Sequence, residues 1–236
     1  ELLPFGGVAK TDEWGTVPSK EDLIVAVAGP ASNGIMIVFA AFCYVCGWWS
    51  YAWADFFVTA NLWLAGFNLL PVYPLDGGRI LQAWMNYKFP YRQAVMYTLL
   101  VSWTLTVVLF VGSLIPLWFG QPLLLNVGVI AVFLLISNVL LWRQRNYQYM
   151  RFLLSRQTEK NLKNKPVSAL MVTEEDTIIS VTKKWKKEAY NIVVVSDTRG
   201  NVVRVLPEES VIWHFFNGTT PYGKFGEFLD GPNRAI

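Results

Sequence analysis

Apolar residues fill four long stretches of the chain, and polar or proline-bearing segments separate them. The stretches run from about Asp22 to Gly47, Phe56 to Leu75, Gln93 to Ser113 and Leu123 to Trp142. Each is close to the roughly 20 residues that an α-helix needs to cross a bilayer. The pattern therefore predicts a polytopic α-helical membrane protein with four spans in residues 22–142.

The pattern changes in the last third of the chain, where charged residues interrupt short apolar runs. Residues Ile192 to Val195 fit a buried strand, Val202 to Leu206 alternate with the period of a second strand, and Glu208 to Phe216 have helical spacing. Residues 166–236 are therefore predicted to form a small α/β domain. Because about seventy residues make only a marginal core alone, we expect this domain to support a homo-oligomer.

Composition and charge support this division of the chain. The mean hydropathy is +0.34 and charged residues make up 16% of the sequence, well below the roughly 25% of soluble domains. Residues 1–142 carry 5 basic and 7 acidic side chains, whereas residues 143–236 carry 15 and 10. This basic excess favours a domain at an anionic membrane surface and argues against a nucleic-acid-binding protein.

Lysine and arginine near the span ends predict the orientation, because they accumulate on the cytoplasmic side of a membrane. Residues 143–165 contain seven basic residues and one acidic residue, which predicts a basic cytoplasmic linker. Counting back along the spans places the loop from Arg79 to Arg92 and the loop from Lys10 to Asp22 on the same side. We expect a multi-pass protein of the cell membrane whose C-terminal domain is cytoplasmic.

A cluster of unusual residues follows the second apolar stretch. Asn68, Pro71, Pro74 and Asp76 lie within nine residues. A carboxylate at the edge of a membrane segment is costly, and irregular backbone at membrane depth survives only beside protein or a wet cavity. Three roles for Asp76 stay open on this basis: a metal ligand, a proton relay, or the cap of an Asp-Gly-Gly turn.

The segment from Asn68 to Gly78 (Asn-Leu-Leu-Pro-Val-Tyr-Pro-Leu-Asp-Gly-Gly) resembles the second signature of the site-2 protease family of intramembrane zinc metalloproteases. The segment from Leu3 to Gly7 and the stretch from Ala28 to Asn33 are similar to other parts of that family. The resemblance covers essentially the whole chain and is strongest to members that act in sporulation.

The resemblance implies a hydrolase that carries out intramembrane proteolysis with Zn²⁺ as its cofactor. Asp76 matches the aspartate that binds the zinc ion in this family. Residues 1–21 correspond to a re-entrant segment with an edge strand, which can pair with an unwound substrate, followed by a cytoplasmic loop. The residues that the resemblance assigns to the substrate cavity are Asn68, Pro71, Pro74, Gly6, Gly7 and Asn33.

The resemblance also implies partners. The substrate would be a membrane-associated sigma-factor precursor, cleaved during sporulation on the mother-cell side of an endospore former. Inhibitory membrane proteins and the lipid bilayer are the other expected partners.

One departure from the family pattern concerns its first signature, His-Glu-x-x-His, which supplies two zinc ligands and a general base. The sequence has no such motif, and its one histidine, His214, lies in the C-terminal domain. No catalytic glutamate is therefore assigned in residues 1–236. We expect the missing helix to precede Glu1; a natural fragment, inactive alone, is the alternative.

The C-terminal domain resembles a single cystathionine-β-synthase (CBS) motif. The similar segments are Val167–Met171, Ile192–Val195 and Val203–Leu206. Such motifs often bind adenine nucleotides such as ATP, yet the usual ribose-binding carboxylate is absent from this sequence unless Glu208 or Glu209 replaces it. Docking and oligomerisation remain the alternative role. For the whole chain, a non-enzymatic transporter or channel with a regulatory CBS domain is the competing hypothesis.

Overall fold

The computed structural model consists of two compact units. The membrane unit contains Ser19–Phe89 and Gln93–Arg145, and the C-terminal unit contains Glu1–Pro18, Pro90–Arg92 and Asn146–Ile236. Within these units the described residues are 2–3, 6–7, 17–120, 122, 124–158, 165–197, 199–217 and 223–226.

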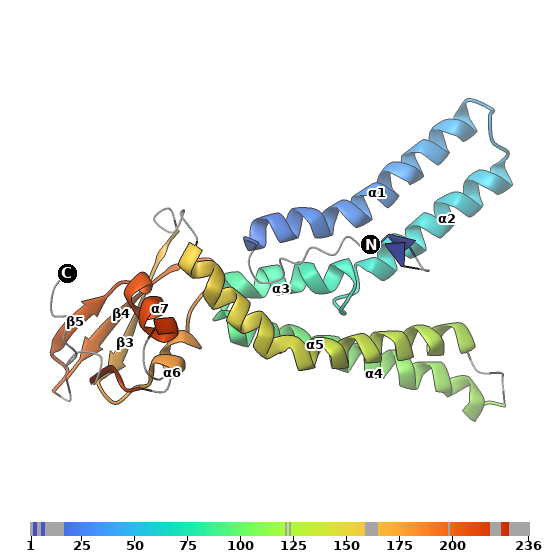
Figure 1. Cartoon of the computed structure of the whole chain (residues 1–236). Coiled ribbons are helices and arrows are strands. Elements are labelled where there is room, and N and C mark those ends of the chain that lie inside the picture. Colours follow the sequence, from blue (N-terminus) through green and yellow to red (C-terminus); the bar gives the residue numbers. More distant parts are fainter. Residues whose placement is uncertain are drawn as a thin grey trace. The chain divides into compact units, whose positions relative to one another are not determined.

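The membrane unit begins with two antiparallel helices, α1 (Ser19–Val45) and α2 (Tyr51–Asn68), which lie side by side (Figure 1). Gly47, with φ of 72°, forms the turn between them, and this left-handed conformation suits glycine. The hydroxyl of Ser50 caps α2 by accepting a hydrogen bond from the backbone N–H of Trp53. The helix predicted from about Asp22 is confirmed, and it continues through Pro30.

A loop from Leu69 to Leu75 separates α2 from α3 (Asp76–Lys88). The second apolar stretch is therefore not one helix as far as Leu75: the helix ends at Asn68, because Pro71 and Pro74 have no N–H to donate to a continuing helix. The connection predicted from Arg79 to Arg92 is largely helical, since Arg79 to Lys88 belong to α3, and its cytoplasmic location stays a prediction. Their polar character reflects a short amphipathic helix.

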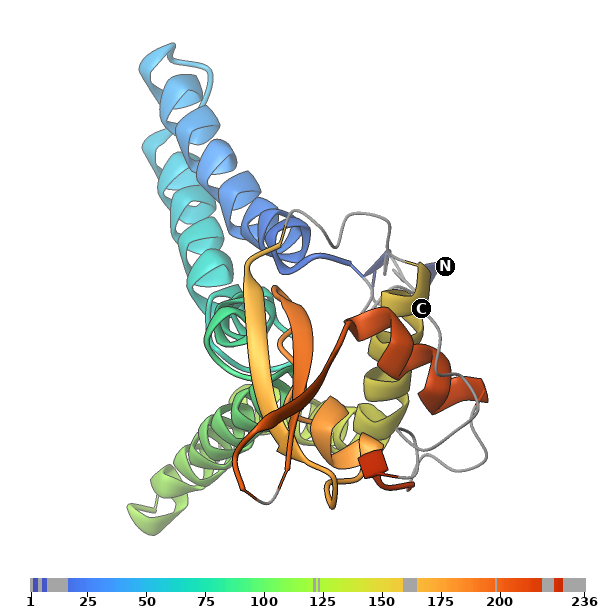
Figure 2. The same ribbon diagram turned by 90° about the vertical axis from the view of Figure 1, so that its left-hand side faces the viewer.

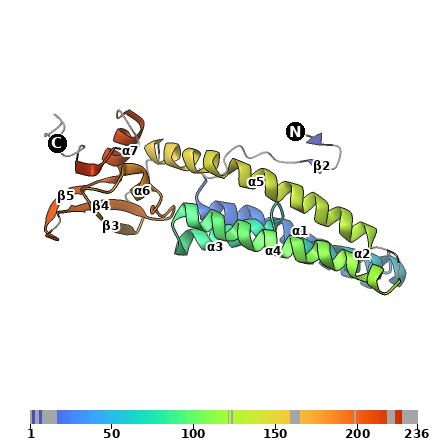
Figure 3. The same cartoon turned by 90° about the horizontal axis from the view of Figure 1, so that it is seen from below.

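The last two helices of the membrane unit run side by side: α4 (Tyr91–Trp118) and α5 (Leu125–Thr158) (Figures 1 and 3). Helix α5 continues well past Trp142, so most of the predicted linker is helical. Among the described residues, three helices, α1, α4 and α5, are long and apolar enough to cross a membrane. Helix α2 is not one of them, and a fourth span stays a prediction.

The C-terminal unit contains a three-stranded sheet in the order β3-β4-β5. Strand β3 (Val167–Thr173) pairs in parallel with β4 (Tyr190–Ser196), which pairs antiparallel with β5 (Val202–Leu206). Helices α6 (Ile178–Thr182) and α7 (Glu208–Asn217) lie on one side of this sheet (Figure 2).

The sequence periodicity of this unit matches its packing. Alternate residues of β4 are buried, namely Asn191, Val193 and Val195. The strands predicted at Ile192–Val195 and Val202–Leu206 and the helix predicted at Glu208–Phe216 are confirmed as β4, β5 and α7, whereas β3 and α6 were not predicted. Near the start of the chain, β1 (Leu2–Leu3) pairs antiparallel with β2 (Gly6–Gly7).

Candidate functional site around Asp76

Asp76 is the first residue of α3 and follows a tightly hydrogen-bonded loop. Within this loop, the N–H of Val72 donates to the carbonyl of Leu70 at 2.7 Å, and the N–H of Leu75 donates to the carbonyl of Val72 at 2.9 Å. Leu75 is extended, with φ of −68° and ψ of 160°, and the helix starts directly after it. An acidic residue in this first turn complements the positive end of the helix dipole.

Gly77 and Gly78 allow the first turn of α3 to pack against the loop backbone. A Cβ atom at Gly77 would overlap the carbonyl oxygens of Leu69 and Leu70, and one at Gly78 would lie 2.8 Å from the carbonyl of Val72. The Asp-Gly-Gly sequence therefore serves close helix–loop packing rather than the turn that its composition suggests. The contacts of Gly77 and Gly78 with the loop therefore fix the position of the Asp76 backbone relative to the loop.

Helix α1 contacts α3 and also lies along α2. The buried residues of α1 are small or polar: Ser19, Ala26, Asn33, Ala40 and Cys43, of which the first four recur at seven-residue intervals and so share one face. Small residues let helix backbones approach closely in membrane proteins. Gly29 lies between two of these positions, and a Cβ atom added there would overlap Oδ2 of Asp76.

Two polar contacts fix the register of α1 and α3. Nη2 of Arg79 donates to Oδ1 of Asp22 at 2.7 Å, with both side chains partly buried. Nδ2 of Asn86 donates to the hydroxyl of Ser19 at 3.0 Å. Sequence reasoning assigned Arg79 to a cytoplasmic loop and missed this pairing, because no local spacing links residues 57 positions apart.

The other predicted site residues occupy three different elements. Asn68 is the last residue of α2 and is half-buried, Pro71 and Pro74 lie in the loop before Asp76, and Asn33 is 9% exposed on α1. The structure thus brings the loop, Asp76 and α1 together in one unit. Gly6 and Gly7 form β2, which belongs to the C-terminal unit and not to the unit that contains Asp76.

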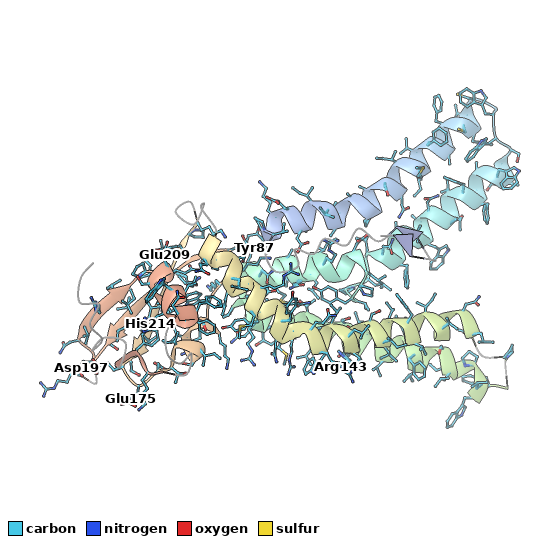
Figure 4. All side chains as sticks on the ribbon, in the orientation of Figure 1. Tyr87, Arg143, Glu175, Asp197, Glu209 and His214 are labelled. Carbon is cyan, nitrogen blue, oxygen red and sulfur yellow. The ribbon has the colours of Figure 1, made fainter. Side chains whose placement is uncertain are left out.

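The described residues hold no group of three His, Cys, Asp or Glu side chains that could bind a metal ion. A catalytic zinc site needs three protein ligands, so Asp76 fits one part of such a site and does not complete it. His214 lies on α7 of the C-terminal unit (labelled in Figure 4), and burial lowers its pKa from the usual value. Its role as a ligand is not supported.

The carboxylates considered for nucleotide binding have other partners. Glu208 is fully buried, where its Oε2 accepts the N–H of Asn191 at 2.8 Å and its Oε1 lies 3.4 Å from Nε of Arg156. Burial raises the pKa of Glu208, and Arg156 opposes this shift. Glu209 accepts a hydrogen bond from the hydroxyl of Tyr190, whose pKa rises to about 12. Glu208 therefore serves the domain core and is not available to a ribose.

Comparison with known proteins gives consistent results. The model of "Peptidase family M50" matches residues 46–109, which include α2, the loop, α3 with Asp76, and most of α4. The chain is 32% identical over 223 residues to stage IV sporulation protein FB of Bacillus subtilis, covering 91% of the chain and 73% of that protein. It is 30% identical over 119 residues to a zinc metalloprotease of Methanocaldococcus jannaschii, covering 49% of the chain and 34% of that protein.

Proposed function

Because the chain belongs to peptidase family M50, a family of membrane-embedded metallopeptidases, we propose that Asp76 is a zinc ligand of an intramembrane protease and that the loop before it helps to form the substrate cavity. The observation that carries this proposal is the packing of Asp76. Its backbone rests on the loop through Gly77, and its carboxylate faces Gly29 on a helix apolar enough to cross a membrane.

The surroundings of Asp76 support a role in binding more than a role in stability. A half-buried carboxylate beside apolar helices is costly unless it has a partner or a task. Arg79 of the same helix attracts Asp76 electrostatically, but its guanidinium is shared with Asp22, to which it donates at 2.7 Å. A hard carboxylate oxygen suits Zn²⁺ beside two imidazoles. The two imidazoles and the general base would come from residues other than those described, since one carboxylate does not hold a catalytic zinc ion.

Asn68, Pro71 and Pro74 are proposed to receive the substrate. The two prolines keep the loop non-helical, so that it can shape a cavity for the substrate instead of continuing the helix. The amide of Asn68, half-buried at the end of α2, offers a donor and an acceptor for an extended peptide. Gly6 and Gly7 of β2 are proposed to offer a strand edge to an extended peptide.

The proposed substrate is a membrane-associated sigma-factor precursor, in keeping with the similarity to a sporulation protein over 91% of the chain. The protein would span the membrane several times, with the C-terminal domain on the cytoplasmic, mother-cell side. That domain is proposed to dock partners or a second copy, and its β-α-β-β-α order supports a CBS-type domain. The buried state of Glu208 argues against the proposed nucleotide site.

The test is cleavage by Asp76→Asn and Asp76→Ala in the protein as its gene encodes it. We expect both variants to insert in the membrane, to lose bound zinc and to lose cleavage. Asp55→Asn is the matched control, because Asp55 is an exposed carboxylate on α2 of the same unit. Undiminished cleavage by the Asp76 variants would exclude the ligand role.

A second variant separates substrate handling from zinc binding. Asn68→Ala should weaken cleavage while the zinc content stays near that of the unmodified protein, because Asn68 belongs to the cavity and not to the ligand set. Zinc content and cleavage are measured on the same preparation. A parallel loss of both would assign Asn68 to the metal site instead.

A further inference from the structure

The loop before Asp76 leaves one amide that cannot bond within the loop. Between Leu70 and Leu75, the two prolines have no N–H, and the amides of Leu70, Val72 and Leu75 donate to nearby carbonyls. The remaining amide, that of Tyr73, donates to the hydroxyl of Ser102 on α4 at 2.8 Å. Because Tyr73 is 2% exposed and lies between membrane helices, this N–H needs a protein partner.

The hydroxyl of Ser102 is itself held by Asn138 on α5. Ser102 donates its one hydrogen to Oδ1 of Asn138 at 2.6 Å, so its lone pairs are left to accept the Tyr73 amide. Nδ2 of Asn138 donates to the carbonyl of Leu134 at 2.9 Å and to the hydroxyl of Thr106 at 3.3 Å. Thr106 donates its hydrogen to the carbonyl of Ser102 at 2.7 Å.

These bonds allow one arrangement of donors and acceptors. Thr106 accepts from Asn138 because its own hydrogen is already donated, and this orients the amide of Asn138 with its oxygen toward Ser102. The side chains of Ser102, Thr106 and Asn138 are all 0% exposed. In such a low-dielectric setting a fully satisfied polar network is rigid, and an unpaired member of it is costly.

We infer that Ser102 and Asn138 are positioning residues for Asp76: across the membrane unit, they hold the Tyr73 amide and thereby fix the loop on which the first turn of α3 rests. The connection is short. The N–H of Leu75 bonds to the carbonyl of Val72, and the N–H of Gly78 bonds to the carbonyl of Leu75 at 3.1 Å. This inference rests on the proposed function, since it concerns the residue that we assign to the metal.

The test compares Ser102→Ala with Ser113→Ala in the protein as its gene encodes it. Ser113 is a matched control, because it is a buried serine on the same helix whose hydroxyl donates to the Phe110 carbonyl of its own helix. Hydrogen exchange of the segment Leu70–Leu75 and the kinetics of substrate cleavage are measured for both. Exchange can be measured without substrate and does not require activity.

For Ser102→Ala we expect the Tyr73 amide to exchange at least about tenfold faster and kcat to fall by about tenfold or more at an unchanged KM, since small misplacements of a catalytic group have effects of this size. Ser113→Ala should change neither. Ser102→Thr, which keeps the hydroxyl, should restore slow exchange and cleavage. A double variant of Ser102→Ala with Asn138→Ala should be no worse than Ser102→Ala alone, because both belong to one network.

Several outcomes would overturn the inference. Unchanged exchange in Ser102→Ala shows that the hydroxyl does not hold the loop, and fast exchange with normal kcat shows that the loop does not position Asp76. If Ser102→Ala fails to fold, Ser102→Cys replaces it, because the thiol keeps the shape and is a weak hydrogen-bonding group. Normal cleavage by Asp76→Ala would instead refute the proposed function, while the exchange result for Ser102 would still stand.

Discussion

Gly29 of α1 faces the carboxylate of Asp76 so closely that a single added methyl group would overlap Oδ2 of the aspartate. The nearest atoms to such a methyl group all belong to the Asp76 side chain, so the contact is specific. Gly29 therefore limits where the Asp76 carboxylate can lie, although the glycine has no side chain that could react or bind a metal. A substitution at Gly29 can move this carboxylate without removing its charge.

We predict that Gly29→Ala lowers cleavage by about tenfold or more while leaving the fold intact, since the methyl group displaces a flexible carboxylate and not backbone. Gly34→Ala is the control: it lies on the same helix and its added methyl group meets nothing within 4 Å. The alanine itself favours helix in both variants. Equal activity of the two variants would show that the contact with Asp76 does not affect catalysis.

We predict that Gly77→Ala destabilises the membrane unit and abolishes cleavage. Its methyl group would overlap two backbone carbonyl oxygens, and backbone does not move aside as a side-chain end does. Gly66→Ala on α2, where nothing lies within 4 Å, should instead be neutral or stabilising by up to about 1 kcal/mol. Thermal unfolding in detergent measures both, and similar midpoints would contradict the packing of α3 on the loop.

We predict that Asp22→Ala and Arg79→Ala each loosen the contact between α1 and α3, by about 1 kcal/mol, since a partly exposed ion pair is rarely worth more. The double variant Asp22→Ala with Arg79→Ala should lose little more than either single variant, because each single change already breaks the pair. Thermal midpoints of the unmodified protein, the two single variants and the double variant form a double-mutant cycle. Additive losses would show that the pair does not join the helices.

The spacing of apolar residues along the sequence predicted most of the individual helices and strands. The apolar runs located α1, α4 and α5, and the alternation of residues 202–206 located β5, because each depends on residues a few positions apart. The apolar pattern continues to Leu75, whereas α2 ends at Asn68, because the stretch that follows is broken by the two prolines, as predicted. Helix α3 was missed because its polar and glycine-rich start is typical of a loop.

The candidate site was predicted only in part, because sequence patterns link residues that are close along the chain and not residues on different helices. The motif singled out Asp76, and its surroundings come from distant segments: Gly29 on α1 and Ser102 on α4. A glycine among other small residues, or a serine in an apolar helix, carries no local signal of its partner. In the C-terminal unit, two neighbouring acidic residues were candidates, and only burial against Arg156 distinguishes Glu208 from Glu209.

The last prediction concerns the stability of the C-terminal unit in acid. Burial lowers the pKa of His214, so the folded state favours its neutral form. The stability from this group is therefore fully present above the unfolded pKa of about 6.5 and is lost as the pH falls below it, because the unfolded state binds the proton first.

His214→Gln keeps a neutral polar side chain and should remove this part of the pH dependence. Between about pH 7.5 and about pH 5.5, the thermal midpoint of the unmodified protein should fall more than that of the variant. Exchange of β4 and α7, corrected for intrinsic rates, reports the same unit independently. If the midpoints fall in parallel, His214 is protonated as readily in the folded domain as in the unfolded chain, and its burial has no energetic consequence.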